Sequence, residues 1–304
     1  MQAREHILIA QPDGERHLEA LGVAAPGAQA TEIDPIQPGG EDISPELAAV
    51  TTVLFADHCP RNVAEMHQLR WVQLGSHGYS QLNGVQLHPD AVVTNASGVN
   101  DLPIAEWCIM MLLALGRKLP DMLAAQREHR WDRSPAFQAE LRGRRVGILG
   151  FGNIGREVAR HCLALGLEVW VMSRGGLHDR GERYDPLRRP AGDVPDVARV
   201  FTLDERAQFF AGLDALVITT PLTGRTRGLV DATALAQLPR HAVVLNPARA
   251  GVVDEYALID ALRNGRLGGA ALDDHYRQPM PPDDPFWALP YPSNQTKHGN
   301  DRVP

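Results

Sequence analysis

The segment Val146–Ala159 constrains the fold of this chain more than any other stretch. A short apolar run ends at three glycines, and the chain then continues directly into a helix-compatible segment. The glycines are Gly150, Gly152 and Gly155. Their G-x-G-x-x-G spacing between a strand and a helix is the dinucleotide-binding fingerprint. The first glycine permits the tight turn, the second lets backbone approach a pyrophosphate, and the third lets the helix lie close to the strand.

The first residues of the predicted helix complete the candidate phosphate site. The N–H groups at the start of a helix have no partner within the helix, and the helix dipole places partial positive charge there. We therefore predict that the backbone of Asn153 and Ile154 binds the pyrophosphate together with the three glycines. A second predicted strand, Leu167–Met172, follows at the distance expected within a nucleotide-binding unit.

Length and composition indicate two globular domains. The chain has 304 residues, of which 44% are hydrophobic, and this is enough for two separate cores. A formal net charge of −7 argues against nucleic acid or an anionic membrane as a partner. The longest apolar run, Trp107–Leu115, is too short to cross a bilayer, and no signal peptide is visible. Three dispersed cysteines without metal-site spacing predict reduced, buried thiols, no metal site and a cytoplasmic protein.

Strands alternate with helical segments along the chain, which predicts an α/β fold made of doubly wound parallel sheets. The predicted strands before the glycine turn are His6–Ala10, Thr51–Ala56, Leu69–Leu74 and Ala91–Asn95. The later ones, after Leu167–Met172, are Ala215–Thr219, Ala242–Asn246 and Gly269–Asp273. A long helix from about Asp101 leads out of the first domain, and a proline-rich tail after Asp274 is expected to return to it.

Four motifs, taken in order along the chain, resemble the D-isomer-specific 2-hydroxyacid dehydrogenases, a family that also contains NAD-dependent formate dehydrogenase. The resemblance covers residues from about 50 to 298, and its motifs are Gly150–Gly155, Thr219–Thr223, Asn246–Asp254, and Leu272–Asp273 with the proline-rich tail. It implies two Rossmann-like domains, namely a discontinuous substrate domain, 1–96 with 275–304, and an NAD(P)-binding domain, 97–274. It also implies reduction of a 2-keto acid such as glyoxylate or hydroxypyruvate to a D-2-hydroxy acid, in a homodimer.

The resemblance further implies an arginine, an acid and a histidine placed in a cleft between the domains. Arg249 matches the arginine that holds the substrate carboxylate and polarises its carbonyl, a task that suits a two-pronged guanidinium. Gln278 stands where hydroxyacid members carry Glu, and a glutamine at this position resembles the one in formate dehydrogenase. His298 matches the general acid–base histidine, although Lys297 replaces the usual proline; His275 is the second candidate.

Other predicted contacts come from loops after strands. Backbone N–H groups of His77, Gly78 and Tyr79 match the loop that grips the substrate carboxylate in the family. The resemblance implies further cofactor contacts, with Asp273 near the nicotinamide amide. These cofactor contacts are Thr220, Pro221, Thr226, Pro247, Ala248, Arg249 and Asp273.

The end of the second nucleotide-domain strand predicts which cofactor is preferred. This strand normally ends in an acid that binds the ribose 2′-OH and repels a 2′-phosphate. Here Ser173 and Arg174 follow the strand, and no acid occurs before Asp179. A serine hydroxyl can donate to a phosphate oxygen, and a guanidinium can pair with the phosphate. We therefore predict NADP as the preferred cofactor, with NAD as the alternative.

Two other functions stay open beside the keto-acid reductase. Gln278 favours a formate-type dehydrogenase, whose hydride transfer needs no proton. The segment from Pro292 to Pro304 is polar and uncharacteristic of the family, which favours a catalytically weak NAD(P)-binding sensor protein. In each case the expected ligand besides the dinucleotide is a small molecule.

Overall fold

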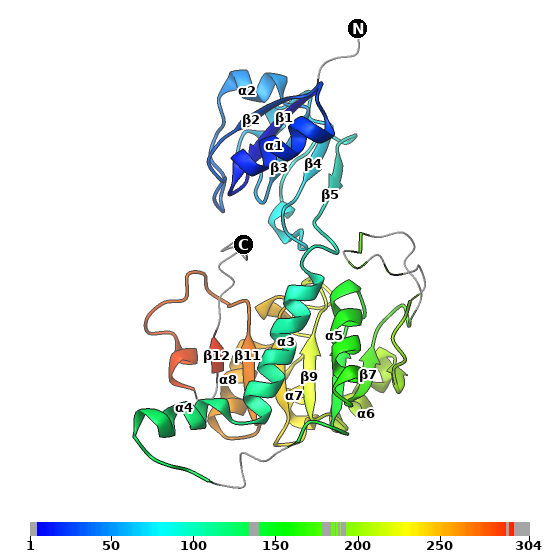
Figure 1. Cartoon of the computed structure of the whole chain (residues 1–304), viewed down its shortest axis with the longest axis vertical. Coiled ribbons are helices and arrows are strands. Elements are labelled where there is room, and N and C mark those ends of the chain that lie inside the picture. Colours follow the sequence, from blue (N-terminus) through cyan, green and yellow to red (C-terminus); the bar gives the residue numbers. More distant parts are fainter. Residues whose placement is uncertain are drawn as a thin grey trace. The chain divides into compact units, whose positions relative to one another are not determined.

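The computed structural model of the chain describes residues 5–133, 140–177, 184, 185, 187, 189 and 193–289, together with the backbone of 292–294. The chain divides into two compact units, one ending at Asn100 and the other beginning at Asp101. Each unit is built on one parallel sheet with helices (Figure 1). The prediction of two Rossmann-like units with doubly wound parallel sheets is confirmed.

The first unit contains a five-stranded parallel sheet in the order β2-β1-β3-β4-β5. Its strands are β1 (His6–Ala10), β2 (Gln29–Glu32), β3 (Val53–Ala56), β4 (Trp71–Gln73) and β5 (Val92–Thr94). Its helices are α1 (Gly14–Ala24), α2 (Pro45–Val50), and the short 3-10 turns η1 (Val63–Glu65) and η2 (Ser80–Leu82). The core on one face of the sheet includes Leu8, Leu54 and Val72.

The second unit contains a seven-stranded parallel sheet in the order β12-β11-β10-β9-β6-β7-β8. Its strands are β6 (Arg145–Leu149), β7 (Glu168–Met172), β8 (Arg199–Phe201), β9 (Ala215–Ile218), β10 (Val243–Asn246), β11 (Gly269–Leu272) and β12 (Pro292–Asn294). Its helices are α3 (Asp101–Gly116), α4 (Leu119–Arg127), α5 (Asn153–Ala164), α6 (Arg206–Ala211), α7 (Ala232–Gln237) and α8 (Glu255–Arg263), with 3-10 turns η4 (Leu203–Glu205), η5 (Ala250–Val252) and η6 (Pro285–Ala288).

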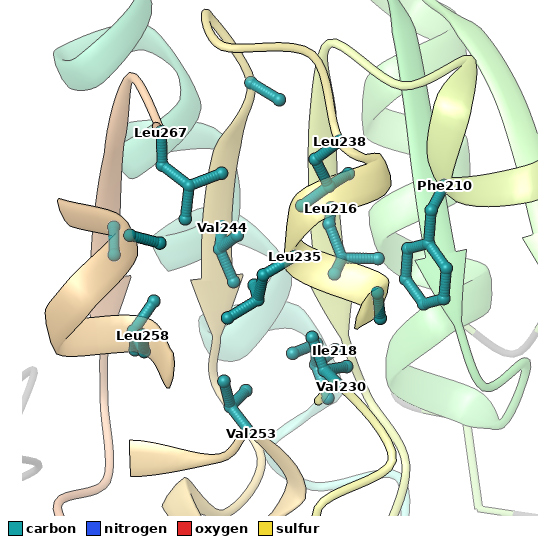
Figure 2. Packing of buried hydrophobic residues seen from close by; sticks show 14 of the residues in the cluster. Phe210, Leu216, Ile218, Val230, Leu235, Leu238, Val244, Val253, Leu258 and Leu267 are labelled. Carbon is teal, nitrogen blue, oxygen red and sulfur yellow. The ribbon is translucent and has the colours of Figure 1, made fainter. Parts of the chain in front are cut away.

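Apolar side chains cover both faces of the seven-stranded sheet. Helices α3 and α5 pack side by side on one face, in a cluster that includes Cys108 and Val158 (Figure 1). On the other face, residues of α6, α7 and α8 form a second cluster with the strands, and Figure 2 shows Leu216, Val244 and Leu235 converging there. Burial on both faces explains why these strands read as continuous apolar runs in the sequence.

The strand order reverses beside β6. The chain builds β6, β7 and β8 outward in one direction, and then places β9 on the opposite side of β6. In open α/β sheets, ligands bind at the carboxyl ends of the strands where the order reverses. The glycine turn follows β6 and Thr219–Thr220 follows β9, so this position falls at the predicted nucleotide site.

The predicted domain boundaries differ from the structure. The prediction grouped 1–96 with 275–304, but residues 275–289 pack on the seven-stranded sheet and belong to the second unit. Phe286 and Leu289 are buried in the core of that unit, and Tyr276 and Met280 pack against it. The proline-rich composition concealed these four apolar anchors, which hold the segment to the nucleotide unit.

The three cysteines, Cys59, Cys108 and Cys162, are buried free thiols. Burial raises the pKa of Cys162 to about 12 and that of Cys59 to about 11. Within the described ranges, no helix is long and apolar enough to cross a membrane. No group of three or more His, Cys, Asp or Glu side chains in that part of the chain is arranged to hold a metal ion.

Candidate functional site

The three fingerprint glycines each meet a different steric demand. Gly150 has φ +95°, in the left-handed region that favours glycine, and its N–H donates to the carbonyl of Met172 at 2.9 Å. A Cβ on Gly155 would lie 2.6 Å from the Gly150 oxygen, so only glycine lets α5 approach β6 so closely. A Cβ on Gly152 would meet nothing within 4 Å, which leaves open space beside its backbone.

The start of α5 offers free hydrogen-bond donors to this open space. Gly152 is the N-cap residue, and no side chain caps the helix there. The N–H groups of Ile154 and Gly155 therefore have no side-chain acceptor, and the positive end of the helix dipole faces the same space. A close turn, an open backbone and an uncapped helix fit a dinucleotide pyrophosphate.

The loop after β9 contains two threonine hydroxyls that differ in their hydrogen bonding. The Thr220 Oγ1 atom is buried and has no hydrogen-bond partner among the described residues. The Thr226 hydroxyl instead donates to the carbonyl of Pro221 at 2.6 Å and accepts from the N–H of Thr223 at 2.8 Å. Thr226, predicted to bind cofactor, therefore closes this loop and holds Pro221, while Thr220 keeps a free polar group beside the glycine turn.

Ser173 and Arg174 lie directly after β7, where the cofactor-selecting acid was absent from the sequence. Ser173 starts a turn, because its carbonyl accepts from the N–H of Gly176 at 3.4 Å. Arg174 is exposed, and its guanidinium has no ion-pair or hydrogen-bond partner in the part of the chain that the structure describes. Arg180 and Arg183, which could add positive charge, lie outside the described residues.

The loop after β10 fixes the backbone of Arg249. The Asn246 Nδ2 atom donates to the carbonyl of Arg249 at 2.9 Å, and the N–H of Ala250 donates to Asp274 Oδ2 at 2.9 Å. Both sides of the Arg249–Ala250 peptide are thus held. Pro247 is buried, and the N–H of Ala248 donates to Asn246 Oδ1 at 3.1 Å.

The Arg249 side chain itself is half-buried and carries no acidic partner among the residues that the structure describes. Its NH1 donates to the carbonyl of Ala248 at 2.8 Å, and no ion pair involves it among the described residues. A half-buried guanidinium without a carboxylate partner is able to bind a carboxylate ligand in the two-pronged manner.

Three sequence-predicted residues meet around the ends of β10 and β11. The N–H of Asp273, a buried residue, donates to the carbonyl of Asn246 at 3.1 Å. The exposed Gln278 donates through Nε2 to Asp274 Oδ1. Asp274 therefore links Gln278 to the loop that carries Arg249.

Of the two candidate histidines, the structure describes only His275. His275 is buried and 5% exposed, packs edge-on to Phe286 with ring centroids 6.1 Å apart, and has an unpartnered Nε2. Burial lowers its pKa, and the Asp274 and Asp284 carboxylates offset part of that effect. His298 lies outside the described residues.

In the first unit, the predicted carboxylate-binding loop turns its carbonyls inward. The carbonyl of His77 accepts from Asn95 Nδ2 at 2.8 Å, and that of Gly78 accepts from Ser76 Oγ at 3.0 Å and from Gln81 Nε2 at 3.2 Å. The N–H groups of Gly78 and Tyr79 have no acceptor within the described ranges. Two adjacent N–H groups without an acceptor are able to bind an anion.

Sequence reasoning missed three polar residues that follow strands. Asp274 was noted only as the start of the tail. Gln11, after β1, is 4% exposed, and its Nε2 has no partner among the described residues; its amide lies over Gly75. Asp57, after β3, has a buried Oδ1 with no partner in the described ranges. The available signal was a polar residue within two positions of the end of an apolar strand, because ligands bind at the carboxyl ends of parallel strands.

The fold and the glycine turn define a Rossmann-type dinucleotide-binding protein, and comparisons with known proteins narrow this class. The NAD binding domain model of the D-isomer specific 2-hydroxyacid dehydrogenases matches residues 109–293. This is more than half of the chain. The chain therefore belongs to the D-isomer specific 2-hydroxyacid dehydrogenase family, and its second unit contains the NAD(P)-binding domain.

Individual relatives agree with this assignment. D-3-phosphoglycerate dehydrogenase of Archaeoglobus fulgidus is 32% identical over 198 residues, which is 65% of this chain but only 35% of that relative. The chain thus spans about a third of the length of this curated relative.

Solved structures cover most of the chain. A D-isomer specific 2-hydroxyacid dehydrogenase from Xanthobacter autotrophicus Py2, solved with NADPH and MES, has 30% identity and a TM-score of 0.75, over 94% of this chain and 85% of that one. An NADPH-dependent glyoxylate/hydroxypyruvate reductase from Sinorhizobium meliloti, solved with NADP and sulfate, has 25% identity and a TM-score of 0.75, over 97% and 88%.

Proposed function

We propose that the protein is an NAD(P)H-dependent oxidoreductase that reduces a 2-keto acid of the glyoxylate and hydroxypyruvate class to a D-2-hydroxy acid. The observation that carries the proposal is the Arg249 loop. It holds a half-buried guanidinium, without an acidic partner in the described part of the chain, at the carboxyl edge of the sheet whose glycine turn fits a dinucleotide. The similarity to the reductase from Sinorhizobium meliloti supports the substrate class.

The chain supplies binding, orientation and polarisation. A bound nicotinamide dinucleotide supplies the hydride. The backbone at Gly152 and the N–H groups of Ile154 and Gly155 would hold its pyrophosphate. Arg249 binds the substrate carboxylate and polarises the carbonyl, which stabilises negative charge on its oxygen during reduction. In the first unit, the N–H groups of Gly78 and Tyr79 bind carboxylate.

Reduction of a keto acid also needs a proton donor. His275 suits this role less well, because burial lowers its pKa and so disfavours the protonated imidazolium that would donate the proton. His298 therefore remains the proposed acid, on the strength of its place in the family motif.

We propose NADPH as the preferred cofactor. The Arg174 guanidinium is exposed and unpaired among the described residues, at the end of the strand where an acid would repel a 2′-phosphate. In a Ser173→Asp/Arg174→Ala variant, the ratio of the dissociation constants of NADH and NADPH should approach one. Equal or tighter binding of NADH by the unmodified protein would contradict the preference.

A homodimer formed through the nucleotide unit is also part of the proposal. The α3 and α4 helices carry exposed apolar side chains around one groove, which Met110, Leu113, Leu119 and Met122 line. Met110 and Leu113 are 46% and 42% exposed on α3. A contiguous exposed apolar patch of this kind is typical of a protein–protein interface.

A paired measurement of binding and turnover tests the proposed function. NADPH and NADH oxidation would be followed with glyoxylate, hydroxypyruvate, pyruvate and bulkier 2-keto acids, beside NAD(P)⁺ reduction with formate. We expect turnover with a small 2-keto acid and none with formate. Dinucleotide binding without turnover would favour the sensor, and formate oxidation would favour the formate-type enzyme.

A further inference from the structure

Asp274 binds one predicted site residue, Gln278, and the backbone directly after another, Arg249. Its Oδ2 accepts the N–H of Ala250 at 2.9 Å, and its Oδ1 accepts Nε2 of Gln278. The contact with Ala250 could not be expected from the sequence, because Asp274 and Ala250 are 24 positions apart along the chain. They meet because β10 and β11 are neighbouring parallel strands whose carboxyl ends lie at one edge.

The contact with Ala250 completes a clamp on the peptide that follows Arg249. Asn246, the last residue of β10, donates to the carbonyl of this peptide, and Asp274 accepts from its N–H. A peptide unit is planar, so holding both its oxygen and its N–H fixes its orientation. The direction in which the Arg249 side chain leaves the backbone is fixed with it.

The segment that carries Asp274 is itself tied down. The Tyr276 hydroxyl donates to the carbonyl of Val253 at 3.0 Å, and Arg277 pairs with Glu255. Together with the Asp274–Ala250 bond, these contacts join residues 274–277 to residues 250–255 in sequence order. Asp274 is therefore held against the Arg249 loop by its neighbours as well as by its own bonds.

The contact with Gln278 selects one orientation of the glutamine amide. An ionised carboxylate only accepts hydrogen bonds, so Gln278 must turn its NH₂ toward Asp274. Its Oε1 then points away from Asp274 as a free acceptor. An acceptor oxygen can receive a hydrogen bond from a proton-donating group or from a substrate hydroxyl. An outward NH₂ could only donate a hydrogen bond and could not bind these groups in this way.

From these contacts we propose that Asp274 is a positioning residue of the reaction. It fixes the Arg249 peptide and orients the Gln278 amide. The Arg249 guanidinium and the Gln278 acceptor oxygen are therefore positioned before substrate binds. The role rests on the proposed function of Arg249. Misplacement of a substrate-binding group by about 1 Å can cost about 100-fold in rate, so the effect of losing Asp274 should be measurable.

Three variants separate the two contacts. Asp274→Ala removes both, and we expect kcat/KM to fall about 100-fold. Asp274→Asn keeps an acceptor for Ala250 but turns its NH₂ toward Gln278, so the Gln278 amide must offer Oε1 to it and present its own NH₂ outward. We expect kcat to fall about tenfold with little change in KM. In Asp274→Asn/Gln278→Glu the asparagine NH₂ can donate to the new carboxylate, which restores an outward acceptor. We expect kcat within about threefold of the unmodified protein.

Asp231→Ala is the matched control. The Asp231 carboxylate also accepts an alanine N–H, that of Ala234 at 2.8 Å, at the start of α7 in the same unit. Thermal unfolding midpoints and NADPH dissociation constants would be measured for every variant. We expect Asp231→Ala to lower the midpoint without changing kcat, and Asp274→Asn to lower kcat without changing NADPH affinity.

Two results would overturn the role. One is an Asp274→Ala variant whose kcat/KM matches that of Asp231→Ala. The other is a kcat of Asp274→Asn/Gln278→Glu that is no higher than that of Asp274→Asn. This second comparison still tests the role if Asp274→Ala does not fold. If the unmodified protein reduces no 2-keto acid, the proposed function fails first and takes the role of Asp274 with it.

Discussion

At the scale of single residues, His275 carries a buried titratable group that the proposed reaction does not use. Its burial lowers its pKa. An imidazole with a lower pKa in the folded chain binds fewer protons there than in the unfolded chain, so stability rises with pH. The contribution is complete above the unfolded pKa of about 6.5 and is lost as the pH falls below that value.

His275→Phe should remove this dependence, because the ring still packs on Phe286 but no longer titrates. Thermal unfolding midpoints measured between about pH 8 and pH 5 test it. We expect the midpoint of the unmodified protein to fall more steeply below about pH 6.5 than that of the variant. Parallel curves for the two proteins would show that His275 does not destabilise the fold when protonated.

Some roles of single residues could be predicted from the sequence, and others could not. The demands on Gly150, Gly152 and Gly155 are local, so their spacing alone predicted a turn, an open backbone and a close approach. Asp274 and Thr226 could not be assigned in this way. The role of Asp274 depends on a partner from a neighbouring strand, and that of Thr226 on the closure of its own loop.

At the scale of elements, the glycine turn and α5 give a contrast between two alanine substitutions. In Gly152→Ala the methyl group enters open space, so stability should change by no more than about 0.5 kcal/mol while the dinucleotide dissociation constant rises at least about tenfold. In Gly155→Ala the methyl group would collide with the Gly150 carbonyl, which should cost about 1–3 kcal/mol of stability.

Denaturant unfolding and fluorescence titration with NADPH measure these two effects. The control for each substitution is the other one, because both add a single methyl group to the same turn. If Gly152→Ala bound NADPH as tightly as the unmodified protein, the open space would not be the pyrophosphate site.

The sequence predicted the strands that are buried on both faces, and also the exposed edge strand β5. The ends of β6, β9, β10 and β11 fell within two residues of their predicted positions. The edge strands β2, β8 and β12 were missed. Strand β2 has the sequence Gln-Ala-Thr-Glu and is largely exposed, so it lacks the apolar pattern that marks a strand.

At the scale of the whole molecule, the proposed dimer face can be broken from the surface. Leu113→Glu places a charge on the exposed apolar groove of α3 and α4, and we expect it to convert a dimer into a monomer. Val23→Glu is the control, because Val23 is 87% exposed on α1 of the first unit. Exposed substitutions of this kind usually change stability by no more than about 0.5 kcal/mol.

Sedimentation velocity at several protein concentrations distinguishes the states. We expect a dimer for the unmodified protein and for Val23→Glu, and a monomer for Leu113→Glu. An unmodified protein that is monomeric at every concentration would remove the dimer from the proposal. The predicted assignment of the segment from residue 275 to the first domain was wrong, because apolar anchors such as Phe286 lie among prolines in the sequence.

The central claim is that Arg249 binds and polarises a 2-keto acid beside a bound nicotinamide dinucleotide. The most direct test is the steady-state oxidation of NADPH with glyoxylate and hydroxypyruvate by the unmodified protein and by Arg249→Lys. Lysine cannot form the two-pronged contact. We predict that kcat/KM falls about 100-fold in the variant while NADPH affinity is unchanged. Full turnover by Arg249→Lys would contradict the account.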